Sequence, residues 1–79
     1  MAQEIFQDAN ILEAAIYHNG IQGGDSGHGG YVEMYLTSTD TFTINDTELY
    51  QCKIRFTGDS ERRNLISALK FFIKELERL

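Results

Sequence analysis

The spacing of hydrophobic residues changes at Gly58, and this change limits the folds open to the chain. Before Gly58, apolar and polar residues alternate, as they do in strands with one buried face. After it, apolar residues recur every three or four positions, as they do along one side of a helix. The pattern predicts an α+β fold: a four-stranded antiparallel meander sheet with one C-terminal amphipathic helix packed on one face.

The expected elements follow from this pattern within a single domain spanning 1–79. Asp59 or Ser60 is predicted to be the N-cap of the helix. Residues 1–10 show no clear period: Ile5 and Phe6 could add a short strand or pack under the core, so no element is assigned to this segment. Alternation and turn-forming residues predict strands at about 11–18, 31–37, 41–44 and 48–57, a helix at about 60–78, a glycine-rich loop at 19–30, and turns at 38–40 and 45–47.

Four strands and one helix cannot cover both faces of a sheet, so one face is expected to stay open. Phe71 also lies about 150° around the helix from the centre of its apolar stripe. A chain of 79 residues has only a small core. These features predict a homo-oligomer with Tyr17, Tyr35 and Phe71 at its interface. The open face is expected to carry Glu13, Tyr17, Tyr31, Glu33, Tyr35, Gln51, Lys53 and Arg55.

Composition excludes several functional classes. The formal net charge of −5 argues against direct binding to DNA through phosphate neutralisation. The lone cysteine, Cys52, cannot form an intrachain disulfide and suits a reducing compartment. No apolar run is as long as a membrane span, and the N-terminus lacks the pattern of a signal peptide. We therefore expect a cytoplasmic protein that does not bind membranes.

The segment Gly20–Gly30 holds six of the seven glycines. Consecutive glycines can bring several backbone N–H groups together in a concavity that binds phosphate without a side-chain charge. We therefore predict a site for a phosphate-bearing ligand here, with donors from the loop and charge from nearby arginines. The predicted ligand-binding residues are Gly23, Gly24, Asp25, Ser26, Gly27, His28, Gly29, Gly30, Tyr31, Arg55, Arg62 and Arg63.

Arg62 and Arg63 are included in this prediction because they lie at the start of the predicted helix. Free N–H groups at a helix N-terminus bind anions, and Arg62 and Arg63 flank the predicted one. The expected site forms where the loop of one subunit meets this end of another. Tyrosines of the open sheet face would stack on a base.

Two other chemistries remain as alternatives. The segment Gly24–Gly27 has the letters Gly-Asp-Ser-Gly of chymotrypsin-like serine proteases, but His28 follows it and the chain is too short for that double barrel. A small hydrolase that uses Ser26 and His28 is left open. His18, Asp25, His28 and Glu33 include possible metal ligands, but their spacing matches no known ligand pattern. No metal or cofactor is predicted.

Two segments carry a resemblance to short phage and prophage proteins that have no established activity. They are 22–30 leading into Tyr31–Leu36, and 58–61 leading into Leu65–Phe71. The resemblance implies a viral origin and hence the host cytoplasm as location. It also implies counter-defence, by an oligomeric sponge for signalling nucleotides or by an acidic inhibitor of a host protein.

These observations predict a small, non-enzymatic, oligomeric protein that sequesters a phosphate-containing signalling nucleotide through its glycine-rich loop. The alternative is an acidic protein-interaction module that occupies a basic surface of a host defence protein. That module would use Glu13, Asp25, Glu33 and the tyrosine-bearing face.

Overall fold

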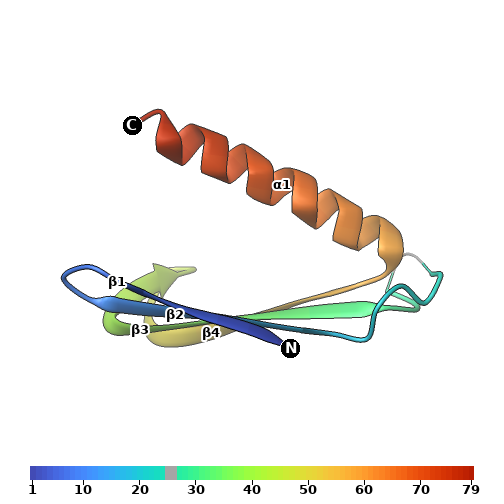
Figure 1. The fold of residues 1–79 in the computed structure, drawn as a ribbon, viewed down its shortest axis with the longest axis horizontal. Coiled ribbons are helices and arrows are strands. Elements are labelled where there is room, and N and C mark those ends of the chain that lie inside the picture. The colour runs from blue at the N-terminus through green and yellow to red at the C-terminus, as the bar shows by residue number, and fades with distance from the viewer. Residues whose placement is uncertain (25–26) are drawn as a thin grey trace. The chain divides into compact units, whose positions relative to one another are not determined.

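The computed structural model describes residues 1–24 and 27–79. The chain forms four strands and one helix (Figure 1). Their bounds are β1 (Ala2–Gln7), β2 (Ile11–His18), β3 (Tyr31–Ile44), β4 (Thr47–Thr57) and α1 (Asp59–Glu77).

The strands form one sheet in the order β1-β2-β3-β4, so neighbours in the chain are neighbours in the sheet. β1 and β2 run antiparallel, with Phe6 opposite Leu12 and Ala2 opposite Ile16. The predicted class, an α+β fold with a four-stranded antiparallel meander and a C-terminal helix, is confirmed. Asn45 and Asp46, both with positive φ, form the two-residue turn between β3 and β4, as hairpin turns of this length require.

The structure corrects the expected assignment of the strands. Residues 31–37 and 41–44 belong to one continuous strand, β3, with no turn at Ser38–Asp40. The side chains of this stretch accept hydrogen bonds from backbone N–H groups: Ile11 donates to Thr39 Oγ1 at 2.9 Å. Because the turn-forming side chains bond within the sheet, the strand continues through them. The fourth strand is β1, in the unassigned N-terminal segment.

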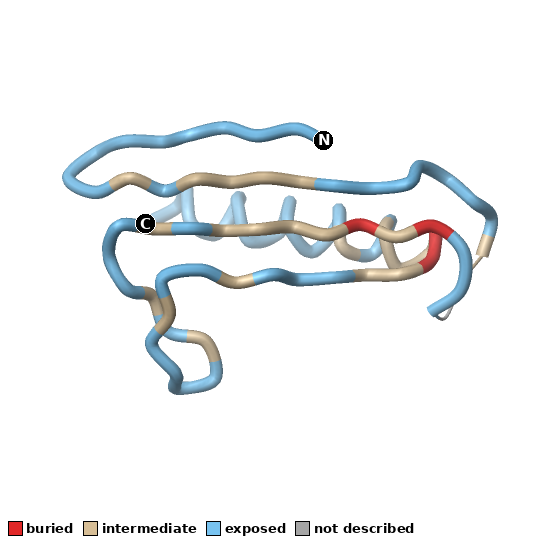
Figure 2. Tube along the Cα trace, turned by 90° about the horizontal axis from the view of Figure 1, so that it is seen from below, coloured by how far each residue is buried: buried red, intermediate tan, exposed pale blue. Residues whose placement is uncertain are grey.

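Two compact units can be distinguished within the chain. The first comprises Met1–His18 and Glu33–Arg55, and the second comprises Asn19–Val32 and Phe56–Leu79. Among the described residues the buried positions are few, and all of them belong to the second unit (Figure 2). They are Gly30, Val32, Gly58 and Asp59.

Candidate functional site

The glycine-rich loop and the first residues of α1 are joined by hydrogen bonds. Gly58 N–H donates to Gly30 O and Asp59 N–H donates to Gly24 O, both at 2.6 Å. Gly27 N–H donates to Thr57 O at 3.2 Å. Segments about thirty positions apart in the sequence thus meet in the second unit. We call this region the loop–helix junction: residues 20–30, without Asp25 and Ser26, together with 57–59.

Asp59 is the central side chain of the loop–helix junction. It is 9% exposed, and its Oδ2 accepts a hydrogen bond from Gly23 N–H at 2.9 Å. Gly58 is the N-cap residue of α1 and makes no side-chain cap bond, and Asp59 is the first helical residue. The predicted N-cap at Asp59 or Ser60 is therefore wrong. A buried carboxylate needs a donor, and the loop supplies one to Asp59.

Close backbone contacts explain the need for glycine at two loop positions. A Cβ atom on Gly24 would lie 2.4 Å from the carbonyl oxygen of His28, and one on Gly30 would lie 2.5 Å from that of Gly20. Both distances are far below van der Waals contact. The loop folds on itself too closely at these two points for any side chain.

These contacts bear directly on the predicted phosphate site. The structure brings the loop glycines to the start of α1 within one chain, whereas the predicted site lay between two subunits. The N–H groups of Gly23 and Gly27, however, donate within the protein. The carboxylate of Asp59 also places a negative charge where a phosphate was expected, and this charge opposes a second anion.

The other predicted residues of this site have different surroundings. His28 and Arg63 are exposed. The Nε atom of Arg62 is shielded from solvent and has no hydrogen-bond partner among residues 1–24 and 27–79. Asp25 and Ser26, named for ligand binding and in the hydrolase alternative, lie outside the described residues.

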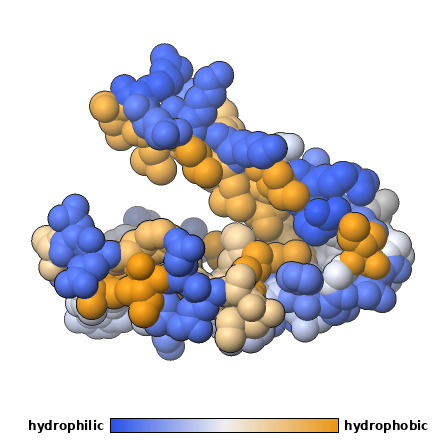
Figure 3. Space-filling view, viewed as in Figure 1, coloured by the Kyte–Doolittle hydropathy of each residue, from blue (hydrophilic) through white to orange (hydrophobic). Residues whose placement is uncertain are grey.

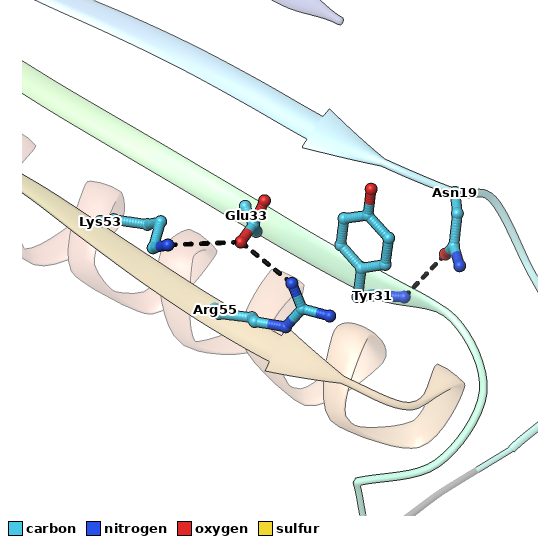
Figure 4. Close-up of polar contacts among 5 residues, drawn as sticks. All are labelled: Asn19, Tyr31, Glu33, Lys53 and Arg55. Carbon is cyan, nitrogen blue, oxygen red and sulfur yellow. Dashed lines mark hydrogen bonds and ion pairs between the residues drawn. The ribbon is translucent and has the colours of Figure 1, made fainter.

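The first unit carries a charged cluster where β3 and β4 are neighbours. Lys53 and Arg55 of β4 both reach Glu33 of β3 (Figure 4). Arg55 Nη1 donates to Glu33 Oε2 at 3.0 Å, and Lys53 Nζ lies 3.7 Å from the same oxygen. The Glu33 side chain is only 16% exposed, whereas that of Lys53 is 53% exposed. The predicted ligand residue Arg55 therefore belongs to an ion pair.

Tyr17 and Tyr35 form an aromatic pair, also in the first unit. Their ring centroids are 5.5 Å apart and the ring planes make an angle of 78°, an edge-to-face arrangement. Side chains within contact distance across neighbouring strands lie on the same face, so this pair and the Glu33 cluster show that odd-numbered residues share faces from strand to strand, as alternation predicted. The backbone N–H of Tyr31, another predicted ligand residue, donates to Asn19 Oδ1 at 2.8 Å (Figure 4).

A pocket of about 290 Å³ lies beside this cluster. We call it the Tyr35 pocket; it is lined by Tyr35, Gln51, Cys52 and Lys53. It combines an aromatic ring, an amide and an ammonium group. The predicted site omitted Gln51 and Lys53. Their period-two spacing with Arg55 on β4 already predicted that they share the open face with the tyrosines and Glu33, but they were not included among the ligand-binding residues.

The remaining predictions concern metals and membranes. In the part of the chain that the structure describes, no three His, Cys, Asp or Glu side chains gather as metal ligands would. Asp25, one of the four residues considered as metal ligands, lies outside the described residues. Among the residues that the structure describes, no helix is both long enough and apolar enough to cross a membrane.

Comparison with known proteins gives no relative for this chain: no protein family, no curated protein and no solved structure matches it. The class is thus defined by the structure alone. It is a small α+β protein with a meander sheet, a glycine loop joined to the start of its helix, and a pocket beside tyrosine and lysine.

Proposed function

We propose that this chain is a binding protein without catalytic chemistry of its own, and that it holds a nucleotide-sized molecule carrying phosphate at the Tyr35 pocket. The observation that carries the proposal is the preformed pocket with Tyr35 in its wall and the Lys53 ammonium beside it. The ligand class is the one predicted from the sequence, whereas the binding site lies on the sheet instead of on the glycine loop.

The charges of the cluster support an anionic ligand. Glu33 is within hydrogen-bond distance of Arg55 but not of Lys53, which lies 3.7 Å away. An ammonium group has three donors. Lys53 is half exposed and lines the pocket, so its donors are available to a phosphate oxygen there.

The aromatic ring and the volume narrow the ligand further. Tyrosine rings stack on nucleobases with little regard to which base is present. A pocket of about 290 Å³ is at the small end of ligand sites, which span roughly 300–1,000 Å³. It therefore suits a mononucleotide better than a larger ligand. Gln51 adds an amide that can donate and accept hydrogen bonds at a base edge.

The predicted alternative, an acidic module that blocks a host protein, receives less support. Its residue Glu33 is largely buried and neutralised by Arg55 and Lys53. Asp25 lies outside the described residues. The acidic module stays a prediction that depends chiefly on Glu13. Counter-defence by sequestration of a signalling nucleotide is the form that our proposed function takes if the chain has the viral origin that the resemblance implies.

The proposal is tested by thermal unfolding with linear and cyclic mononucleotides at millimolar concentration, beside nucleosides and inorganic phosphate. A ligand at a hundred times its dissociation constant stabilises the folded state by about 2.7 kcal/mol. We expect at least one nucleotide to raise the melting temperature by several degrees, and nucleoside or phosphate alone to raise it less. No shift with any nucleotide would contradict the proposal.

Four variants locate the site in the same assay. Lys53→Gln and Tyr35→Leu should each remove most of the nucleotide shift, whereas Lys74→Gln, which removes a lysine from the last turn of α1, should leave it unchanged. Asp59→Asn removes the negative charge at the loop–helix junction. If the ligand bound the glycine loop instead, this variant would increase the shift; binding at the Tyr35 pocket predicts no change.

A further inference from the structure

Glu33 shares one carboxylate oxygen between two cations beside the Tyr35 pocket. Its Oε2 accepts a hydrogen bond from Arg55 Nη1 at 3.0 Å and lies 3.7 Å from Nζ of Lys53, a residue of the pocket wall (Figure 4). These residues all belong to the first unit. The Glu33 side chain is largely buried, so little water screens its charge. A ligand that binds Lys53 therefore meets a negative charge held in place by the protein.

The distances bring a bound phosphate close to this carboxylate. Charge-assisted N–H···O bonds are about 2.7–2.9 Å long, so a phosphate oxygen bound to Lys53 Nζ lies within roughly 7 Å of Glu33 Oε2. This separation is below the Debye length of about 8 Å at physiological ionic strength. Glu33 therefore repels each negative charge that a ligand brings to Lys53.

The cluster can balance a single negative charge of a ligand. Arg55 and Glu33 neutralise each other as a hydrogen-bonded pair, which leaves the charge of Lys53. A phosphodiester carries one negative charge, whereas a phosphomonoester carries about 1.5 to 2 at pH 7. Taking a charge out of water costs free energy unless the charge is paired. In this cluster the additional charge of a monoester has no cation of its own and is repelled by Glu33.

We propose that Glu33 sets the class of phosphate that the Tyr35 pocket binds: a singly charged phosphodiester, as in a cyclic mononucleotide or a nucleotide ester, in preference to a phosphomonoester. This preference rests on the proposed function of the pocket and specifies its ligand further. Glu33 acts on the ligand through Lys53 and is a specificity-determining residue. The volume of the pocket, about 290 Å³, agrees with a ligand that has one phosphate group.

Two ligands that differ by one methyl group test the preference. Adenosine 5′-monophosphate is a monoester, and its methyl ester at the phosphate is a diester of nearly the same size. Calorimetric titration of the full chain at neutral pH gives both dissociation constants. We expect the methyl ester to bind roughly two- to fivefold more tightly, the size of an interaction between partly exposed charges. Tighter binding of the monoester to the wild-type chain would overturn the proposal.

The variant Glu33→Gln removes the charge and keeps an oxygen that accepts a hydrogen bond from Arg55. Both cations then face the ligand without a carboxylate between them. We expect the monoester to bind roughly fivefold more tightly than it binds the wild-type chain, and the methyl ester to gain less, so that the order of the two ligands reverses. Equal gains for both ligands would contradict a role of Glu33 in the choice of phosphate.

Glu48→Gln is the matched control, because it changes the net charge of −5 by the same amount. Glu48 is exposed and lies five residues before Lys53 in β4, which is roughly 16 Å along a strand and beyond the Debye length. Hydrophilic residues are spread over the face seen in Figure 3, so one charge remote from the pocket represents the general surface field. This variant should change both constants less than about twofold. Equal effects of Glu48→Gln and Glu33→Gln would assign the preference to net charge.

Salt dependence of the wild-type chain keeps the test decisive if Glu33→Gln does not fold, which circular dichroism would show. Added salt screens the repulsion, so the ratio of the two dissociation constants should approach one. A ratio independent of salt would mean that the added methyl group makes a contact, and it would overturn the proposal. Absence of binding by every nucleotide would contradict the proposed function itself, whereas binding with an unchanged order in Glu33→Gln would contradict only the role of Glu33.

Discussion

Replacing Asp59 with alanine should lower the free energy of unfolding by about 2 kcal/mol, because a hydrogen bond to a charged group contributes roughly 1.5–3 kcal/mol. The carboxylate of Asp59 is buried and accepts the N–H of Gly23, which would lose its partner. In a domain of this size each kcal/mol shifts the melting temperature by about 4–8 °C. We therefore expect a fall of about 10 °C, measured by thermal unfolding.

The conservative variant Asp59→Asn separates the hydrogen bond from the charge. Asparagine keeps an oxygen that accepts the Gly23 N–H, but it loses the favourable negative charge in the first turn of α1, which contributes about 0.3–1 kcal/mol. We expect this variant to lose less than 1 kcal/mol. Equal losses in Asp59→Asn and Asp59→Ala would show that the charge matters and that the bond to Gly23 does not. Hydrogen exchange at the Gly23 amide should accelerate only in the alanine variant.

A Gly30→Ala substitution should be the second strongly destabilising change. Its Cβ would lie 2.5 Å from the carbonyl oxygen of Gly20, and the obstruction is backbone, which cannot rotate away. It would also lie 3.4 Å from Asp59 Oδ1. Overpacking of this kind costs roughly 1–3 kcal/mol, so we expect a loss of about 2 kcal/mol in urea unfolding.

The control for Gly30→Ala is Ile21→Ala in the same loop. Ile21 is 71% exposed, and surface substitutions change stability by less than about 0.5 kcal/mol. If both variants unfold at the wild-type urea concentration, the close approach of Gly30 and Gly20 is not part of the stable fold. A loss confined to Gly30→Ala supports a closely packed glycine loop.

The outcome at Ser38–Asp40 shows how sequence patterns are overridden. Serine, threonine and aspartate favour turns because their side chains bond to nearby backbone groups. Here Ser38 does accept the N–H of Asp40 two positions on, but Thr39 accepts the N–H of Ile11 in the neighbouring strand β2. The side chains thus make the local bond that favours a turn, yet pairing with β2 keeps this stretch in a strand. The N-terminal strand β1, which the sequence left as one of two alternatives for Ile5 and Phe6, has the same cause, because its pairing with β2 and not its own pattern orders it.

For the candidate sites as well, the sequence predicted one part of the arrangement and the tertiary structure decided the other. Alternation along β3 and β4 was sufficient to predict that tyrosines, Glu33 and the basic residues of β4 share a face, and the Arg55–Glu33 and Tyr17–Tyr35 contacts agree with it. The pairing of charges could not be predicted, because it depends on the register between strands. Without that register, Arg55 is a plausible phosphate ligand; with it, the arginine already has a carboxylate partner.

By itself, the sequence determined the class of fold, since the change of period at Gly58 separates strands from helix and each period follows from backbone geometry. It also determined the stripe of α1. The tertiary structure alone decided what the glycine-rich loop does. Donors and acceptors about thirty positions apart have no sequence signal of their own, and only folding brings Gly23 to Asp59 and Gly30 to Gly58. The segment predicted to hold an external anion thereby binds the carboxylate of its own helix.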